Sequence, residues 1–371
     1  MTSADVLVVG GGPAGSSCAW KLRRAGFDVL VVDRAVFPRD KVCAGWITPA
    51  VAEALHLDVE DYRRTRTFQP ITRFRTGIMG RRLVDTSYAA PVSFGILRRE
   101  FDHYLLERSG ARLALDLQVK RIARTQAGWV VNDAYAAPFL VGAGGHFCPV
   151  ARHLNGPRRE EPVVVANEVE FVLSPQQMEA CRVAPDAPEL YFCSDLAGYG
   201  WCFRKEQVLN VGIGRQDRRR LTEHLHRFVT ELQRAGRVPK DLPEGWRGHA
   251  YLLYDSSPRT LVDDDALLIG DAAGLAYTQS GEGIRPAVES GLLAAQAIAG
   301  VAGGRRSDAL AAYQAAVQAR FGRRGRTHRG LLPRPAIAAV GRRLLGTRWF
   351  SRHVVLDRWF LRRQGSGVRA Q

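Results

Sequence analysis

The sequence lacks the cysteine pairs, long apolar runs and leader segment that would place it in several large classes of protein. Its six cysteines contain no Cys-x-x-Cys pair, so neither a zinc site nor a four-cysteine iron–sulfur site is indicated. No run of about 18 apolar residues is present, so we expect no membrane-spanning helix. The first expected strand begins at about Asp5, which leaves no room for a hydrophobic leader, and we expect a reducing, cytoplasmic compartment.

Acidic residues are scarce in only one part of the chain, its C-terminal tail. Residues 320–371 contain 14 arginines, no lysine and a single acid, Asp357. Nearly all of the net charge of +16 therefore lies in this tail, and the rest of the chain is close to neutral. The hydrophobic content of 46% over 371 residues excludes a disordered chain and is enough for a large core.

A dinucleotide-binding unit is predicted at the N-terminus. An apolar run at residues 5–9 leads into a glycine-rich turn, a helical stretch and a second apolar run that ends at Asp33. In this order Gly10 allows the tight turn, Gly12 lets the backbone approach a pyrophosphate, and Gly15 lets helix and strand pack closely. The alternative is a glycine-rich turn in another kind of α/β protein.

Further residues of this unit are expected to contact the nucleotide. The helix that begins near Pro13 and Ala14 directs its positive N-terminus toward the phosphates. Asp33 is placed to hold a pair of ribose hydroxyls, and Arg34 follows it. Only one such glycine motif is present, so the sequence predicts no second Rossmann site that would bind a nicotinamide cofactor. NAD(P)H or another reductant would then be a transient electron donor.

The rest of the chain predicts an α/β fold with an inserted antiparallel sheet. Helices are expected at 98–110, 283–300 and 308–320, and a buried parallel strand at 266–271. The segments 70–96 and 160–215 are rich in strand signals. We therefore expect a discontinuous Rossmann-like dinucleotide-binding domain, an inserted antiparallel-sheet substrate domain and a basic, helical C-terminal extension. The first of these domains would comprise residues 1–69, 97–155 and 258–320. The substrate domain would comprise 70–96 and 156–257, and the C-terminal extension 321–371.

Two further motifs point to a flavin. The segment 268–274, with Gly270 and Asp271, and the segment Gly281-Glu282-Gly283-Ile284 resemble the second flavin-contact motif of the p-hydroxybenzoate hydroxylase superfamily. The resemblance implies that Asp271 binds the ribityl chain and that a helix N-terminus near Gly283 faces the flavin pyrimidine ring. A third motif, Arg98-x-x-Phe101-Asp102-x-x-Leu105, resembles the same superfamily. It implies that Arg98 reaches the flavin phosphates and sugar and that the dinucleotide-binding domain is an FAD-binding domain, although Arg98 alone could be a surface helix arginine.

One branch of that superfamily matches in more detail. Phe37-Pro38-Arg39-Asp40-Lys41-Val42-Cys43-Ala44-Gly45 resembles a segment of the geranylgeranyl reductase family, and Tyr199-Gly200-Trp201-Cys202-Phe203 is similar to its substrate-cavity segment. The resemblance covers roughly residues 4–320. It implies that Cys43 faces flavin and substrate and that Tyr199 and Trp201 wall an apolar pocket. The alternatives are a small buried cysteine and ordinary sheet core.

The chain also departs from the family pattern. The two prolines that bracket the substrate-cavity segment in the family are Leu196 and Arg204 here, and Arg204 would bring a charge beside an apolar cavity. An Asp-Gly pair that is common in the hydroxylases is Gly144-Gly145 here, which weakens the case for direct NADPH use.

The basic tail interleaves arginine with apolar residues. On one helix, Val340, Leu344, Leu345, Val355 and Trp359 can share a face, with Arg342, Arg343, Arg352 and Arg362 elsewhere. This pattern is typical of an amphipathic helix at an anionic membrane surface, here the inner face. The alternatives are a helix packed on the body and, less favoured, a nucleic-acid or acidic protein partner.

Together these observations predict an FAD-dependent oxidoreductase that reduces a carbon–carbon double bond in an isoprenoid or other lipid-like substrate. The main alternative is a flavin-dependent monooxygenase or halogenase that forms a C4a-peroxyflavin on an apolar or aromatic substrate. Electron transfer to a quinone and a non-enzymatic flavin-bound scaffold are further alternatives.

Overall fold

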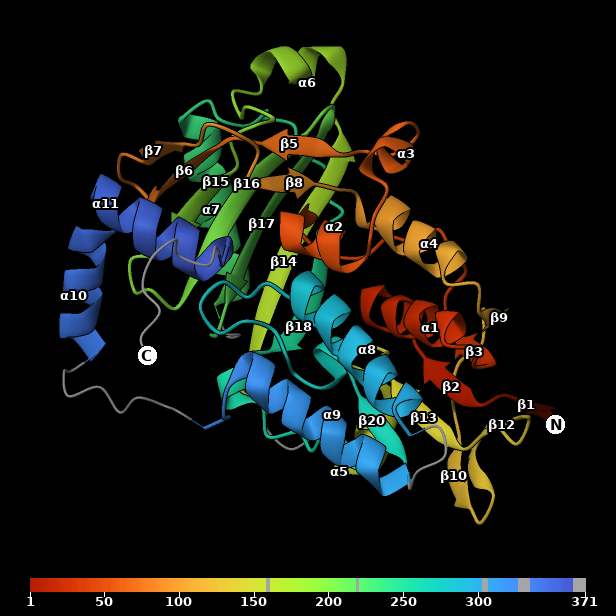
Figure 1. The fold of residues 1–371 in the computed structure, drawn as a ribbon. Coiled ribbons are helices and arrows are strands. Elements are labelled where there is room, and N and C mark those ends of the chain that lie inside the picture. The colour runs from red at the N-terminus through yellow and green to blue at the C-terminus, as the bar shows by residue number, and fades with distance from the viewer. Residues whose placement is uncertain (158–160, 218–219, 302–305, 326–333, 363–371) are drawn as a thin grey trace.

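The computed structural model describes residues 1–157, 161–217, 220–301, 306–325 and 334–362 (Figure 1). Its first sheet has the strand order β19-β20-β13-β2-β3-β9, and every pair is parallel except β19–β20. Strands β2 and β3 are both Val-Leu-Val-Val runs with four buried residues each, as a parallel sheet covered on both faces requires. The strand bounds are β2 Val6–Val9, β3 Val29–Val32, β9 Arg112–Ala114, β13 Phe139–Gly142, β19 Val262–Asp263 and β20 Ala266–Leu268.

Helices pack on both faces of this parallel sheet. Among them, α1 and α8 lie side by side, and α9 lies against α8 (Figure 1). The expected helices at 98–110, 283–300 and 308–320 are present as α4, α8 and α9. Their bounds, with those of the others here, are α1 Pro13–Arg24, α4 Arg98–Arg108, α5 Pro149–Asn155, α8 Ile284–Ala299 and α9 Arg306–Phe321.

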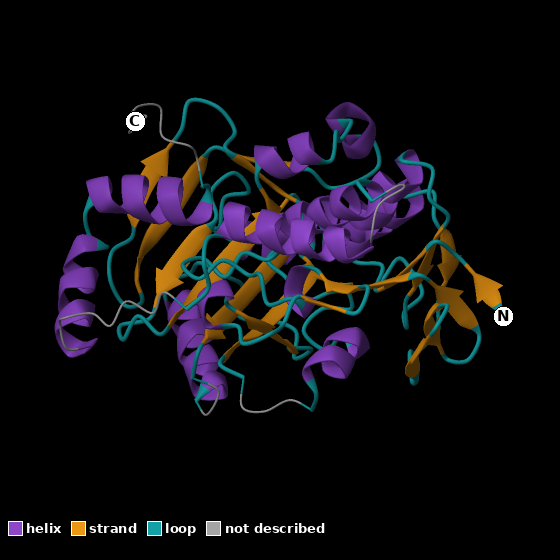
Figure 2. Ribbon diagram, turned by 60° about the horizontal axis from the view of Figure 1, so that its bottom comes forward, coloured by secondary structure: helices purple, strands orange, loops and turns teal. Residues whose placement is uncertain are grey.

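A seven-stranded sheet of order β18-β14-β17-β16-β15-β6-β7 forms the other half of the molecule (Figure 2). The expected antiparallel sheet is present, with one exception in its pairing, because β15 runs parallel to β6. These two strands come from separate segments of the chain, and such a crossover allows parallel pairing. The bounds are β6 Arg73–Ile78, β7 Val84–Ser87, β14 Val163–Val172, β15 Glu189–Phe192, β16 Gly198–Lys205, β17 Val208–Arg215 and β18 Arg247–Leu252.

The two faces of this sheet have different partners. Helix α7, Leu221–Arg234, covers one face, where a Cβ at Gly200 would lie 2.7 Å from the Phe228 ring. The division into domains stays a prediction.

Two smaller sheets and several short helices complete the fold. One sheet consists of β1 Thr2–Ser3, β10 Ile122–Thr125, β11 Gly128–Val131 and β12 Tyr135–Ala137, and the other of β4 Trp46–Ile47, β5 Gln69–Ile71 and β8 Ser93–Gly95. The short helices are α2 Pro49–Ala54, α3 Val59–Arg63, α6 Pro175–Ala180, η1 Tyr254–Ser256 and η2 Gly270–Ala272.

The C-terminal segment packs against the other face of the seven-stranded sheet. It forms α10, Arg334–Leu344, then α11, Arg348–Phe350, and the π-helical η3, Ser351–Phe360 (Figure 1). The expectation of one continuous apolar face is wrong. Leu345 and Val355 are buried in the same core cluster as the sheet, whereas Val340 and Leu344 are exposed.

The chain turns between α10 and α11, where Thr347 caps the second helix, so the apolar residues of the two pieces face different surroundings. The tail's single acid, Asp357, accepts a hydrogen bond from the Tyr88 hydroxyl of the sheet at 2.9 Å. Residues 326–333 and 363–371 of the expected extension lie outside the described residues. Within the part that is described, no helix combines the length and the apolar character needed to cross a membrane.

Candidate active site

A cavity of about 1160 Å³ lies where the parallel sheet, the seven-stranded sheet and the C-terminal segment meet. Fourteen of the sixteen site residues expected from the sequence line it. They are Gly10, Gly12, Pro13, Ala14, Asp33, Arg34, Cys43, Arg98, Tyr199, Trp201, Asp271, Gly281, Gly283 and Ile284. The other two, Gly15 and Gly270, lie behind its wall.

The glycine-rich turn is shaped by close backbone contacts. Gly10 has a φ of +116°, and a Cβ there would lie 2.4 Å from the carbonyl oxygen of Ala143. A Cβ at Gly15 would lie 1.9 Å from the carbonyl oxygen of Gly10, so Gly15 holds helix α1 against the turn. Gly12 occupies the N-cap position of α1 and has no side chain that could cap the helix, and the first turn of α1 contains no acid. The N-terminal amides of α1 are therefore available to a ligand anion.

Two charged side chains flank that helix N-terminus. Asp33 accepts hydrogen bonds from the backbone N–H groups of Gly11, at 2.7 Å, and Ala35, at 2.9 Å, at the end of β3. Arg39 reaches over the turn, because a Cβ at Gly12 would lie 3.4 Å from its Nη2. The buried Nη1 of Arg39 has no hydrogen-bond partner among the described residues. An unpaired guanidinium nitrogen beside free helix amides fits a diphosphate.

Arg98, the first residue of α4, is held by an acid of its own helix. Its Nε and Nη2 donate to the two carboxylate oxygens of Asp102, both at 2.7 Å, and Asp102 also pairs with Arg39 at 3.1 Å. Arg98 is 8% exposed and Asp102 fully buried. The two arginines thus share one buried carboxylate. The expected contact of Arg98 with flavin phosphates stays a prediction.

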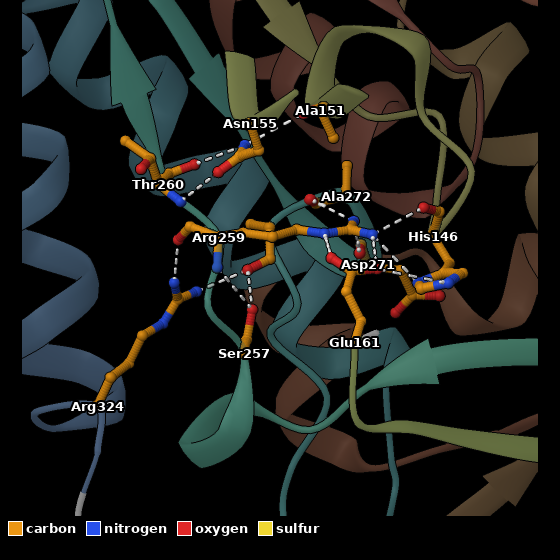
Figure 3. A network of polar contacts seen from close by, with 11 residues as sticks. His146, Ala151, Asn155, Glu161, Ser257, Arg259, Thr260, Asp271, Ala272 and Arg324 are labelled. Atoms are coloured by element: carbon orange, nitrogen blue, oxygen red, sulfur yellow. Dashed lines mark hydrogen bonds and ion pairs between the residues drawn. The ribbon is translucent and has the colours of Figure 1, made fainter. Parts of the chain in front are cut away.

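The turn that carries Asp271 is fixed by a buried arginine that sequence reasoning missed (Figure 3). Arg259, 5% exposed, donates twice to Glu161, at 2.8 Å each, and once to the carbonyl oxygen of Ala272, also at 2.8 Å. Gly270 has a φ of +58°, and its N–H donates to Ser290 Oγ of α8 at 2.9 Å. The partners lie far apart in sequence, so no local pattern could have shown this network.

Asp271 faces two basic groups across the cavity. His249 Nε2 lies 3.4 Å from Asp271 Oδ2, and Lys41 Nζ lies 3.0 Å from His249 Nδ1. Burial lowers the pKa of Lys41 to about 8, and burial together with the charge of Lys41 lowers the pKa of His249. Burial raises the pKa of Asp271, but the hydrogen bond from His249 and the nearby positive charges outweigh it and leave the pKa lowered. Asp271 is therefore a carboxylate at neutral pH.

The opposite wall is formed mainly by apolar side chains of the seven-stranded sheet. Tyr199, Trp201 and Phe203 alternate along β16 and all line the cavity. The Tyr199 hydroxyl donates to the carbonyl oxygen of Ser280 at 2.5 Å, and Trp201 Nε1 donates to Asn210 Oδ1 at 2.6 Å. The expected charge of Arg204 is not beside the cavity: this residue is absent from the lining and lies on the other face of the strand.

Cys43 and the C-terminal segment complete this wall. Cys43 is partly buried, and its thiol accepts a long hydrogen bond, 3.5 Å, from the Gly45 N–H. Phe360 of η3 stacks on Trp46 with ring centres 5.6 Å apart and meets Tyr199 edge-on at 5.5 Å. The tail thus supplies part of the cavity wall, which the sequence did not indicate because Phe360 follows β16 by more than 150 residues.

Sequence reasoning also missed two carboxyl groups that line the cavity, Glu168 and Glu282. Both carboxylate oxygens of Glu282 and Oε2 of Glu168 are buried without a hydrogen-bond partner among the described residues. The strand pattern alone does not single out Glu168, because the run 163–172 also contains Asn167 and a second acid, Glu170, two residues further along the same face.

The fold and cavity define an FAD-dependent oxidoreductase, and the family description "FAD dependent oxidoreductase" matches residues 5–88. The menaquinone reductase of Mycobacterium tuberculosis is 31% identical, over 79% of this chain and 76% of the relative. The geranylgeranyl diphosphate reductase of Rhodobacter capsulatus is 29% identical, over 79% and 74%. The chain belongs to the geranylgeranyl reductase-like family of FAD-dependent oxidoreductases.

Solved structures share the fold. A geranylgeranyl bacteriochlorophyll reductase-like protein from Thermoplasma acidophilum has a TM-score of 0.73 at 22% identity, covering 93% of this chain and 88% of that chain. Flavin-dependent halogenases are also among the structures with this fold.

Proposed function

We propose that this protein reduces a carbon–carbon double bond in an isoprenoid or other lipid-like molecule. The observation that carries the proposal is that one cavity joins two unlike walls. One wall has the free N-terminus of α1, Arg39 and Asp33, and the other is formed mainly by aromatic and aliphatic side chains such as Trp201. An apolar small molecule held against the second wall lies next to a nucleotide bound at the first.

The cofactor is held by residues of the first wall in this proposal. The amides of α1 and the free Nη1 of Arg39 bind the diphosphate, Asp33 binds the ribose, and Asp271 binds the ribityl chain. The N-terminus of α8 has no acid in its first turn and faces the pyrimidine edge, where it favours negative charge. When bound and reduced, FAD would supply the hydride for the alkene, and NAD(P)H or another transient donor would supply the electrons that reduce it.

The chain's own residues align the alkene. An isolated double bond is a poor hydride acceptor, so the reaction depends on close positioning more than on electrostatic activation. Tyr199 and Trp201 are held in place by hydrogen bonds to Ser280 and Asn210, and Phe360 packs on Tyr199. This wall of fixed aromatic side chains excludes water and limits where the chain of an isoprenoid can lie.

The test is anaerobic incubation of the FAD-loaded, dithionite-reduced protein with geranylgeranyl diphosphate and with menaquinone, followed by mass spectrometry. We expect a product heavier by one pair of hydrogens for each reduced bond of the isoprenoid chain. For menaquinone the chain is weighed after the ring has been reoxidised, because dithionite by itself reduces the quinone ring. A product that gains an oxygen atom when air is admitted, with no reduced product under argon, would instead establish a monooxygenase. Failure to change either probe under both conditions would overturn the proposal.

The C-terminal segment is proposed to bring the cavity to an anionic membrane surface. Val340 and Leu344, one turn apart on α10, are 55% and 39% exposed, and Trp349 of α11 is 67% exposed. Arg343 and Arg348 are exposed in the same segment. Apolar side chains flanked by arginines suit the interface of such a membrane, and each arginine near it contributes about 1 kcal/mol.

Vesicle flotation tests this contact. We expect binding to vesicles that contain phosphatidylglycerol and little binding to pure phosphatidylcholine. Trp349→Ser should weaken binding roughly tenfold, because it removes a large interfacial side chain. Val172→Ser is the matched control, since Val172 is also 67% exposed but lies on β14. Equal loss in both variants would show that the segment has no special role.

A further inference from the structure

One acid lies within the aromatic wall of the cavity. Glu168 of β14 is paired with Gly212 of β17, and Trp201 of β16 is paired with the same glycine, so the three residues form one row across the sheet. A Cβ at Gly212 would lie 2.2 Å from the Trp201 ring and 2.8 Å from Glu168 Cβ. The indole therefore lies over the glycine toward Glu168, and both side chains line the cavity.

The two oxygens of this carboxyl group have different surroundings. Oε1 accepts the backbone N–H of Cys43 at 2.5 Å, which ties the strand to the loop that carries the cysteine. Oε2 is buried and has no hydrogen-bond partner within the described ranges. Glu168 as a whole is 4% exposed. One oxygen thus fixes the orientation of the group, and the other remains for a proton.

The surroundings favour the neutral acid. Burial raises the pKa of Glu168 to about 7, and the negative charge of Glu170 adds to this effect. The Cys43 amide, the charge of Lys205 and the nearby side-chain amide of Asn210 oppose it but do not outweigh it. Lys205 is itself paired with Glu170. The paired strand residue Arg247 is 62% exposed at its side chain and pairs with Asp40. A substantial fraction of Glu168 is therefore protonated at neutral pH.

The other acids that line the cavity differ in position or partner. Asp33 accepts two backbone amides, Asp271 faces His249, and Asp40 pairs with Arg247. Glu282 also has unpartnered oxygens, but it lies in the loop that leads into α8, near the charges of Arg285 and Arg362. Glu168 combines a fixed oxygen, an unpartnered oxygen and a place beside Trp201.

We propose that Glu168 is the catalytic acid that protonates the alkene, an assignment that rests on the proposed double-bond reduction. One alkene carbon takes the hydride that reduced FAD supplies, and the other takes the proton. As the new C–H bond forms there, the O–H bond of Glu168 breaks and its electron pair stays on the carboxylate. The carboxylate then regains a proton from water before the next turnover. General acids of this kind contribute about 10²- to 10⁴-fold in rate.

The experiment compares Glu168→Gln with the wild-type holoenzyme, with geranylgeranyl diphosphate as the probe, because a quinone ring would reoxidise the flavin without any reduction of an alkene. The anaerobic reoxidation of the reduced flavin by the probe is followed in single turnovers across pH. In the wild type we expect the rate to fall as pH rises through about 7, because only the protonated acid reacts. In Glu168→Gln we expect a rate lower by about 10²-fold or more, without this pH dependence.

Two readouts do not depend on turnover. The infrared measurement uses a Glu282→Gln background, because the pKa of Glu282 is also raised to about 7. In that background the band of a protonated carboxyl group should titrate near neutral pH and be absent when Glu168→Gln is added. The affinity of the oxidised holoenzyme for the probe should be unchanged, because glutamine keeps the acceptor for the Cys43 amide. If that variant fails to retain FAD, Glu168→Asp replaces it, and its pH-dependent fall in rate should persist.

Three results would overturn the assignment. Glu168→Gln could keep the wild-type rate and pH profile, or Glu282→Gln could be the variant that loses them. The infrared band could also survive when Glu168→Gln is added to the Glu282→Gln background. A wild-type holoenzyme that reduces neither geranylgeranyl diphosphate nor menaquinone is a different outcome, since it overturns the proposed function and the assignment with it.

Discussion

The contact between α1 and α8 leads to a stability prediction whose sign is opposite to that of helix propensity. Gly291 lies inside α8, where an alanine would normally stabilise a helix by about 1 kcal/mol. In this structure a Cβ at position 291 would lie 2.3 Å from the Ala14 carbonyl oxygen and 3.1 Å from the Cys18 nitrogen. Both atoms belong to the backbone of α1, so no side chain can move aside.

The expected cost follows from these distances. Ordinary contact begins at 3.4 Å, so α1 and α8 would have to separate by about 1 Å. Overpacking of this kind costs about 1–3 kcal/mol, and contact with backbone places it near the upper end. After the gain in helix propensity, Gly291→Ala should lose about 2 kcal/mol of stability. Because Ala14 lines the cavity, FAD affinity should fall roughly tenfold as well.

Thermal unfolding and FAD titration measure the two effects. We expect Tm to fall by about 3 °C. Gly341→Ala is the matched control, because Gly341 also lies in a helix, α10, but its added methyl would meet only the end of the Leu196 side chain, at 2.6 Å. That control should keep wild-type FAD affinity. A Gly291→Ala protein as stable as the wild type, with unchanged FAD affinity, would refute the packing argument.

Three other substitutions test separate parts of the site. Arg259→Ala removes the buried partner of Glu161 and the support of the Asp271 turn, so urea unfolding should show a loss of about 3–5 kcal/mol; a loss below about 1 kcal/mol would contradict this. Phe360→Ala enlarges the cavity, so kcat/KM should shift toward bulkier alkenes and stability should fall by about 3 kcal/mol; an unchanged preference among probes would refute its place in the wall. Burial raises the pKa of Glu282 from 4.5 to about 7. Between pH 4.5 and 7 the folded apoprotein therefore keeps a proton on Glu282 that the unfolded chain has lost, so the stability of the apoprotein falls as pH rises through this range. Glu282→Gln should therefore stabilise the apoprotein by up to about 3 kcal/mol above pH 7 and have little effect below pH 4.5, and stability curves that stay parallel across pH would contradict it.

Local patterns were sufficient for the cofactor half of the site. The apolar run, the turn from Gly10 to Gly15 and Asp33 lie within one short segment, so their spacing alone fixes their relation in space. The resemblance around Asp271 and Gly283 added the second flavin segment. Eleven of the thirteen expected cofactor residues line one cavity for this reason, while their individual roles remain predictions.

The substrate half depended on long-range packing. Glu168, Trp201 and Phe360 line one cavity only because three strands pair in register and the C-terminal segment packs against the sheet, and no spacing in the sequence encodes that arrangement. The amphipathic pattern of the tail was visible, but which apolar residues become buried depended on the turn at Thr347.

The sequence by itself therefore determined the fold class and the flavin-binding segments, because hydrophobic period and glycine spacing act over a few residues. Only the tertiary structure decided which side chains face the cavity across from them. That choice depends on strand register and on the docking of distant segments, where one residue of shift would turn Glu168 and Trp201 away from the site.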